Sequence, residues 1–366
     1  MQTSPLQSLR VIELASVLAG PSVGQFFAEW GATVIKIENQ NPGGDVTRTW
    51  KLPSESRQES RSSYFACCNW GKTSIALDLH QNEDRQRVYD LIAEADLVIT
   101  SYKAGDAQKL GMDYVSLKTL KSDLIYGKIT GYPEGDTRVG YDGILQAETG
   151  FTYLNGEADT GSQKMPVALI DVLAAHQLKE GLLIALLRRT QTGQGAEVSV
   201  SLFEAGVSSL ANQATAYLTA GQIPHPKGSD HPNIVPYGTI FQTRTCSIVL
   251  GVGSDAQFQR LAKLLGYPEW VSDERFSTNP ARVKHREAIK AKISAVFLDW
   301  NGEELLSKLH QENIPAGDIR DMKAVFEDKN TRQIMLEDGD FRAVRLNVAR
   351  IDGKLPDFPL STPPKF

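Results

Sequence analysis

The sequence predicts an α/β protein, with a large doubly wound, Rossmann-like parallel-sheet domain followed by a smaller α/β domain. Three observations lead to this prediction. β-rich runs alternate with helical patterns through residues 9–129, an order typical of parallel sheets covered by helices. A Pro-His-Pro-Lys-Gly cluster at 224–228 then interrupts the pattern. Beyond this cluster, a hairpin pattern and three helical stretches begin a second series of predicted strands and helices.

The first unit of this alternation is the clearest. It reads as a strand at 9–14, a turn at 15–21, a helix at 22–30 opened by Pro21, and a strand at 33–38. Glu38 ends the second strand, about where a dinucleotide fold would bind a ribose. The turn lacks the G-x-G-x-x-G glycines that let a pyrophosphate approach the backbone, so we reject a nicotinamide-dependent dehydrogenase.

The remaining elements continue the pattern in order. We expect a long polar loop at 41–61, and then strands at 74–79, 96–100, 123–129 and 196–201 with helices at 82–95, 172–189 and 202–220. The second series contains a hairpin of 240–243 with 247–252, followed by helices at 255–265, 281–298 and 302–312. We therefore predict a large domain over 1–222, a small domain over 223–320, and a segment over 321–366 that packs back on the large domain.

Composition and charge narrow the function classes. Of the 366 residues, 41% are hydrophobic and 23% are charged, as expected for a globular protein. The net charge of −5 gives no reason to expect nucleic acid or an anionic membrane as partner, and no apolar run is long enough to span a bilayer. The three cysteines show no metal-ligand spacing, so we expect no metal, no disulfide framework and a reducing cytoplasm as the compartment.

A single carboxylate stands at a prominent position. The apolar run 165–170 ends at Asp171, and leucines at helical spacing follow as far as Arg189. We therefore expect Asp171 at the N-cap of a long helix. Its carboxylate could serve only to accept orphan backbone N–H groups. Alternatively, the same N–H groups and the helix dipole could keep it ionised as a nucleophile at a cleft.

Ten short segments, spread over nearly the whole chain, carry a family resemblance. They are LAGP at 18–21, GATVIKIE at 31–38, GDVTR at 44–48, NWGKTSIALDL at 69–79, LGMDY at 110–114, GYD at 140–142, TGQG at 192–195, HPNIVPY at 231–237, FSTN at 276–279 and IPAG at 314–317. In this order and spacing they resemble the class III CoA-transferases, the family of formyl-CoA transferase and carnitine CoA-transferase.

The resemblance implies both a reaction and an assembly. Asp171 falls where the family carries its catalytic aspartate. The implied reaction transfers coenzyme A from an acyl-CoA to a carboxylic acid, through a mixed anhydride and an aspartyl-CoA thioester at Asp171. Coenzyme A enters as acyl-CoA co-substrate, and no metal is implied. The family's large and small domains are joined into a ring, and two rings are expected to interlock as a homodimer.

The resemblance also suggests which residues contact coenzyme A. Val17, Leu18 and Ala19 match a turn along the pantetheine, and Lys72 matches a basic residue near the nucleotide. Lys109 stands where a family arginine meets phosphates, although a surface role remains open for both lysines. The positions bordering the thioester match Gly131, Tyr132 and Glu134. Leu18 replaces a glutamine of oxalate-using members, which removes an amide donor.

Two other functions stay open within this fold. An α-methylacyl-CoA racemase would abstract a proton instead of forming an anhydride, and a catalytically idle acyl-CoA-binding relative would use Asp171 only as a cap. The racemases that share the fold carry histidine where this chain has Tyr141. Because tyrosine has an ordinary pKa near 10, it is a poor base at neutral pH, which favours the transferase.

Overall fold

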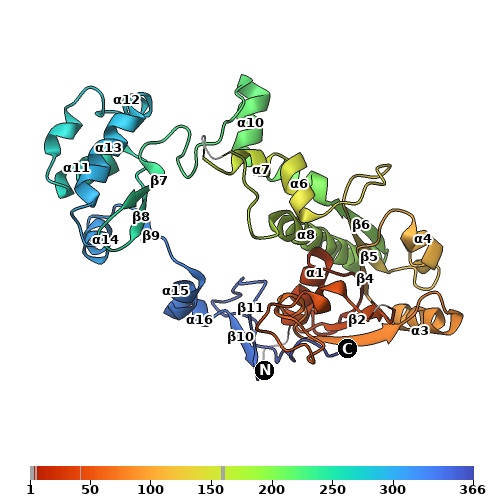
Figure 1. The fold of residues 1–366 in the computed structure, drawn as a ribbon. Coiled ribbons are helices and arrows are strands. Elements are labelled where there is room, and N and C mark those ends of the chain that lie inside the picture. The colour runs from red at the N-terminus through yellow and green to blue at the C-terminus, as the bar shows by residue number, and fades with distance from the viewer. Residues whose placement is uncertain (1–3, 5, 42, 158–160) are drawn as a thin grey trace. The chain divides into compact units, whose positions relative to one another are not determined.

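The computed structural model describes residues 4, 6–41, 43–157 and 161–366 (Figure 1). These residues form two compact units. The first contains the described residues up to 151 together with 164–222 and 332–366. The second contains those of 152–163 together with 223–331. The division into domains over 1–222, 223–320 and 321–366 stays a prediction, since compactness alone does not identify independently folding parts.

The first unit is built on a six-stranded sheet whose strands all run parallel. Their order across the sheet is β3-β2-β1-β4-β5-β6, which is one of the two common doubly wound orders. The predicted parallel α/β sheet is therefore confirmed. The strands are β1 Arg10–Leu14, β2 Thr33–Asn39, β3 Lys72–Leu77, β4 Leu97–Thr100, β5 Ile125–Thr130 and β6 Ala196–Ser201.

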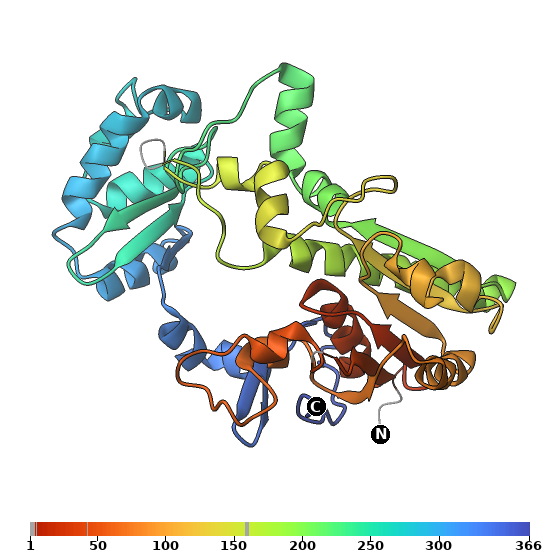
Figure 2. The ribbon, with the colours of Figure 1, turned by 45° about the vertical axis from the view of Figure 1, so that its right-hand side comes forward.

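Helices cover both faces of this sheet (Figures 1 and 2). On one face, α1 (Ala19–Glu29) and α8 (Leu169–Thr192) share a core with the central strands through Val23, Phe27, Leu178, Leu182, Val11 and Ile99. On the other face, α3 (Asn82–Ala93) contributes Val88 and Ile92 to a second core with Ile12 and Val98. Strands β1 and β4 are buried along nearly their whole length, because helices cover both faces of the sheet.

Shorter elements complete the first unit. They are η1 Val46–Thr49, α2 Ser63–Ala66, α4 Asp106–Leu110, α5 Tyr114–Leu117, α6 Asp142–Glu148, α9 Leu202–Ser208, α10 Ala211–Ala220, β10 Met335–Asp338 and β11 Phe341–Val344, while α7 Phe151–Leu154 lies at the boundary of the two units. The expected single helix over 202–220 is wrong. It is broken after Ser208, and Ala211 adopts a positive φ of 47°.

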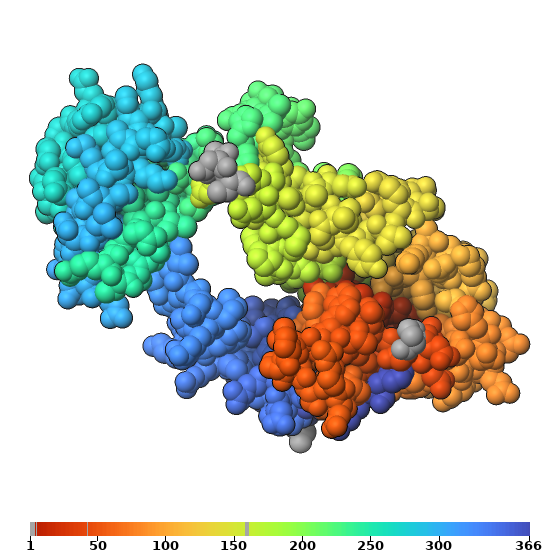
Figure 3. Space-filling model, viewed as in Figure 1, coloured from red at the N-terminus to blue at the C-terminus, as the bar shows by residue number. Residues whose placement is uncertain are grey.

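The polar loop at 41–61 is held to the sheet and to the last segment of the chain. Arg48 donates to both carboxylate oxygens of Glu38, at 2.8 and 2.6 Å, and to the carbonyl of Pro364 at 3.0 Å. Arg61 donates to the carbonyl of Pro363 at 3.1 Å. Figure 3 shows the orange atoms of the loop against the blue atoms of the last segment. These contacts fix a loop that has little regular structure of its own.

The second unit has a three-stranded antiparallel sheet of β7 Tyr237–Gln242, β8 Ser247–Gly251 and β9 Ala316–Asp318. The predicted hairpin is β7 with β8. Its helices before β9 are α11 Asp255–Leu264, η2 Pro268–Val271, α12 Asn279–Lys284, α13 Arg286–Phe297 and α14 Gly302–Gln311, while α15 Met322–Glu327 and α16 Lys329–Arg332 follow β9 in the chain. The expected helix over 281–298 is two helices, because His285 leaves helical geometry with a φ of −111° and a ψ of 32°.

Across the described ranges, no helix combines the length and the hydropathy that crossing a bilayer would need.

Candidate active site

A cleft of about 390 Å³ opens at the carboxyl ends of β1, β4, β5 and β6. The strand order reverses between β1 and β4, and doubly wound folds bind their ligands at this switch point. Seven of the nine residues expected from sequence line the cleft: Val17, Leu18, Ala19, Gly131, Tyr132, Glu134 and Asp171. Segments far apart in the chain thus meet where the fold provides a ligand site.

The two predicted lysines do not line the cleft. Lys109 is 75% exposed and pairs with Asp106 at 2.9 Å, on the surface of α4. Lys72 is buried, and its Nζ donates to Glu13 at 2.7 Å, to the carbonyl of Pro21 at 2.8 Å and to Asn69 at 2.9 Å. With all its donors engaged inside the protein, Lys72 serves the structure and has no free N–H for a nucleotide.

The helix that carries Asp171 begins earlier than the sequence suggested. Helix α8 starts at Leu169 with Ala168 as its N-cap, so Asp171 is the third helical residue and the N-cap prediction is wrong. The cap is supplied from elsewhere, since the N–H of Ile170 donates to Oδ1 of Asp142 at 2.8 Å. Asp171 is thereby released from a capping role.

Asp142 and Gln146 were missed as site residues. Both lie on α6, and the Gln146 side-chain amide donates to Oδ2 of Asp142 at 2.8 Å and to the carbonyl of Val167 at 3.1 Å. The same amide accepts the N–H of Met165 at 2.9 Å. Their four-residue spacing on a helix was a signal that they could act together. Together they fix the segment that leads into Asp171.

The environment of Asp171 is unusual for a carboxylate. The residue is 8% exposed, and within the described part of the chain its carboxylate accepts no hydrogen bond and forms no ion pair. Burial, with a further contribution from Asp142, raises the pKa of Asp171 to about 7. Desolvation opposes the effect of the helix dipole, and at a pKa near 7 the carboxylate is still ionised in part of the molecules at neutral pH. An unpartnered carboxylate that titrates near neutrality can act as a base or as a nucleophile.

The turn that leads into α1 lines the cleft and has a strained backbone. Val17 adopts a positive φ of 72°, which is an outlier for a β-branched residue and costs about 1–2 kcal/mol relative to right-handed geometry. Its N–H lies 3.2 and 3.4 Å from the two carboxylate oxygens of Asp45, a buried residue. This contact holds the turn into α1 in a conformation that valine would not otherwise favour.

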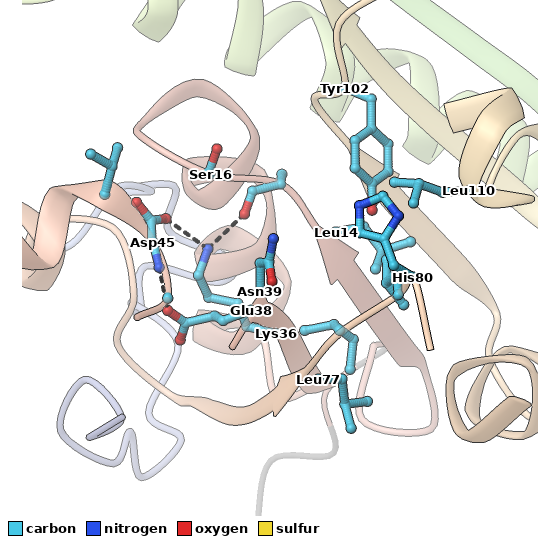
Figure 4. Close-up of a pocket in the computed structure, with 15 residues that line it drawn as sticks. Leu14, Ser16, Lys36, Glu38, Asn39, Asp45, Leu77, His80, Tyr102 and Leu110 are labelled. Carbon is cyan, nitrogen blue, oxygen red and sulfur yellow. Dashed lines mark hydrogen bonds and ion pairs between the residues drawn. The ribbon is translucent and has the colours of Figure 1, made fainter. Parts of the chain in front are cut away.

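A second cavity of about 280 Å³ adjoins the cleft, and Ser16 and Tyr102 line both (Figure 4). Its wall contains the side chains of Leu14, Ile37, Leu77, Leu79 and Leu110 together with His80, Asn39 and Glu38. Mostly apolar walls with polar groups at the edge suit a flat aromatic ring such as a nucleobase.

Three basic side chains line the cleft itself. Arg138 lies 3.9 Å above the ring of Tyr132 and pairs with Asp136 at 2.8 Å. Lys128 pairs with Glu197 at 2.7 Å. Lys103 forms no ion pair with any described residue. These cations could face phosphate groups. None of them was among the predicted site residues, because Lys and Arg in loops and at strand ends are common.

Among the described residues, no group of three or more His, Cys, Asp or Glu side chains could hold a metal ion.

The raised pKa of Asp171 predicts how pH affects stability. Its pKa is about 7 in the folded protein, against an ordinary 3.8, so folding takes up a proton between these values. The stability from this proton is present below pH 4 and is lost as pH rises through 7. Asp171→Asn cannot ionise, and its melting temperature should exceed that of the wild type by about 3 °C near pH 8, with a smaller difference near pH 5.

Thermal unfolding followed by circular dichroism at the two pH values measures this difference. The matched control is Asp299→Asn at an exposed position of the second unit, which should follow the wild type throughout. An Asp171→Asn protein that is no more stable than the wild type near pH 8 would mean that the site stabilises the carboxylate anion.

Comparison with known proteins identifies the family of this chain. The model of CoA-transferase family III matches residues 6–353. Succinate–glutarate CoA-transferase of Agrobacterium fabrum is 37% identical over 356 residues, covering 95% of this chain and 86% of that protein. Succinyl-CoA:glutarate CoA-transferase of Mus musculus is 31% identical, covering 88% of this chain and 74% of the mouse protein.

Solved structures of other proteins are also similar to this chain. A CaiB/BaiF family protein from Brucella suis superposes with a TM-score of 0.88 at 38% identity, covering 100% of this chain and 97% of that chain. Rv3272 from Mycobacterium tuberculosis superposes with a TM-score of 0.87 at 26% identity, covering 100% of this chain and 98% of that chain. The family match spans nearly the whole chain, and relatives and structures alike extend over most of its length. This chain therefore belongs to CoA-transferase family III.

Proposed function

We propose that this protein transfers coenzyme A from succinyl-CoA or a similar acyl-CoA to a dicarboxylate of the glutarate class, with Asp171 as nucleophile. One observation carries the nucleophile assignment: Asp171 is a buried carboxylate without a partner among the described residues, in the cleft at the switch point of the sheet. The substrate class rests on relatives that are named for succinate and glutarate.

The first half-reaction begins with an oxygen of the Asp171 carboxylate, which attacks the carbonyl carbon of the acyl-CoA thioester. The carbon–sulfur bond breaks, coenzyme A leaves as thiolate, and a mixed anhydride forms. The thiolate then attacks the aspartyl carbonyl carbon of this anhydride. The donor acid leaves as carboxylate, and an aspartyl-CoA thioester remains on the enzyme.

The second half-reaction is the reverse with a new acid. The acceptor carboxylate attacks the aspartyl thioester, the thiolate leaves, and a second anhydride forms. The thiolate attacks the acceptor's acyl carbon, which regenerates the Asp171 carboxylate and releases the new acyl-CoA. One thioester replaces another, so no nucleotide hydrolysis is needed. Water must be excluded, because both anhydrides hydrolyse readily.

The surroundings of Asp171 suit this role. A carboxylate that accepts no hydrogen bond has little solvation to lose as it attacks. The nearby charge of Asp142 disfavours the Asp171 anion. Acylation neutralises the Asp171 carboxylate and therefore relieves its repulsion with Asp142. The two adjoining cavities have room for an extended ligand, with an aromatic base near Leu77 and the thioester arm along Val17.

The racemase alternative has less support. Exchange of a proton next to a thioester needs a second proton-transfer group on the face opposite Asp171. In the described part of the chain, no histidine lines the cleft. Tyr141 lies at its edge, with 58% of its surface exposed. A solvent-exposed phenol is a poor partner for such an exchange.

Trapping the acyl group tests the nucleophile directly. The wild type is incubated with succinyl-CoA, without acceptor, and is then treated with hydroxylamine, whose nitrogen displaces coenzyme A or succinate from the aspartyl carbonyl. Peptide mass spectrometry should find a hydroxamate on Asp171. Asp171→Ala should give no adduct and should lose about a thousandfold or more of the transfer rate to glutarate.

The opposite outcomes are equally clear. Transfer by Asp171→Ala above about a tenth of the wild-type rate would exclude a covalent role for this residue. Solvent deuterium at the α-carbon of a 2-methylacyl-CoA, incorporated by the wild type and not by Asp171→Ala, would favour the racemase.

The pKa of Asp171 also predicts the pH dependence of transfer. Only the ionised carboxylate attacks, so kcat/KM for succinyl-CoA should rise with pH and be half-maximal near 7. Asp142→Asn removes the nearby negative charge and should shift the midpoint down by about half a pH unit or more. Rates measured from pH 5 to pH 9 check both expectations. A profile that stays flat in the wild type across this range would contradict the raised pKa.

We also propose that the protein is a homodimer of interlocked chains. Helix α8 exposes Leu183, Ile184 and Leu187, and α10 exposes 79% of Leu218. A second copy would cover such apolar side chains, which monomers seldom expose in groups. The interlocking of the two chains is inferred from the family resemblance.

Sedimentation velocity tests this assembly. The wild type should sediment as a dimer at every concentration down to nanomolar, because linked chains cannot separate without unfolding. Ile184→Lys should disrupt assembly, whereas Val115→Lys, at a similarly exposed site on α5, should sediment as the wild type does. A reversible monomer–dimer equilibrium at micromolar concentration would rule out interlocking.

A further inference from the structure

Four charged side chains form a buried cluster below the turn that leads into α1. We call Glu13, Lys36, Asp45 and Lys72 the turn clamp. Lys36 pairs with Glu13 at 2.9 Å and with Asp45 at 3.0 Å, and Lys72 pairs with Glu13 at 2.7 Å. The exposed fractions of these side chains are between 0 and 1%. The clamp holds two positive and two negative charges, so its charges balance.

The clamp binds the backbone of the turn at three points. Lys36 donates to the carbonyl of Ala15 at 2.7 Å, Lys72 donates to the carbonyl of Pro21 at 2.8 Å, and Asp45 accepts the N–H of Val17. These contacts span both ends and the middle of the segment 15–21. The middle contact falls on the one residue of the turn whose φ is unfavourable for its type.

Part of the clamp also contacts both cavities of the candidate site. Lys36 and Asp45 line the smaller cavity, where Figure 4 shows the Lys36 ammonium directed toward Asp45. Val17, held by Asp45, lines the larger cleft. One ion pair therefore lies in the wall of one cavity and contacts the backbone that lines the other.

We propose that Asp45, held by Lys36, is a positioning residue that keeps Val17 in its left-handed conformation and so shapes the wall along which the coenzyme A arm binds. Asp45 does not touch the reacting atoms; it acts through Val17. The identity of the ligand rests on the proposed function, whereas the effect of Asp45 on the turn does not. If the proposal is right, the need for Asp45 should disappear when residue 17 adopts a positive φ without cost.

Glycine satisfies that condition. The test is a double-mutant cycle of wild type, Asp45→Asn, Val17→Gly and the double variant. Asp45→Asn should weaken binding of free coenzyme A, measured by calorimetry, about tenfold in the wild-type background. In the Val17→Gly background the same change should weaken it less than about threefold. Equal losses in both backgrounds would overturn the proposal.

A second measurement does not depend on the ligand. Amide hydrogen exchange of the peptide over 15–22 should accelerate in Asp45→Asn about tenfold or more. The matched control is Glu29→Gln, which alters another buried carboxylate, at the far end of α1, that accepts the N–H of Leu346 at 2.8 Å. It should leave exchange over 15–22 and coenzyme A affinity unchanged. Unchanged exchange over 15–22 in Asp45→Asn would also overturn the proposal.

Misfolding and failure of the proposed function can be told apart. If Asp45→Asn does not fold, Val17→Pro provides the test of the proposal. Proline lacks the N–H and cannot adopt a positive φ, and this substitution leaves the four side chains of the turn clamp unchanged. Coenzyme A affinity and exchange over 18–22 that match the wild type in Val17→Pro would overturn the proposal. A wild type that binds no coenzyme A would refute the proposed function alone, and hydrogen exchange would still decide the role of Asp45.

Discussion

The buried charges of Glu13, Lys36, Asp45 and Lys72 are the constraint on which the first unit depends. Removing four charges from water is costly, and the cost is offset only when every donor and acceptor finds a partner. Here the partners come from three neighbouring strands, the polar loop and the start of α1. Helix α1 lies so close to them that a Cβ on Gly24 would come within 1.8 Å of Glu13. The position of the cleft wall follows from this arrangement.

The second constraint is the balance at Asp171 between the helix N-terminus, which favours the anion, and burial, which disfavours it. A helix N-terminus favours an anion, typically by less than about 1 kcal/mol at an exposed position, whereas burial of an unpaired carboxylate costs more. Asp142 adds repulsion and at the same time takes over the capping of the helix. The result is a carboxylate that performs no structural task and titrates near neutral pH. Such a group suits covalent chemistry that must begin with an ionised nucleophile and pass through a neutral anhydride.

Much of the fold was predictable because it depends on local pattern. Apolar strands buried on both faces, helices of regular period and the turn at 15–21 identified the doubly wound sheet, and all six strands lie close to their predicted positions. Family resemblance located Val17, Gly131 and Asp171, because it compares whole segments. Element ends were less certain: α8 begins at Leu169 and the helix over 202–220 is broken. Tertiary contacts, such as the bond from Ile170 to Asp142, decide where such helices begin and end.

The sequence by itself determined the parallel sheet, the second series of elements and the carboxylate at the start of the long helix. Only the tertiary structure decided which charges meet. Lys72 and Lys109 look alike in sequence, yet one is sealed beneath the turn and the other is exposed on α4. Asp142 and Ile170 are 28 residues apart, and Val17 and Asp45 are also 28 apart. The hydrophobic period of an element predicts which of its faces is buried. It does not predict which polar residue of a distant segment will pair with that element.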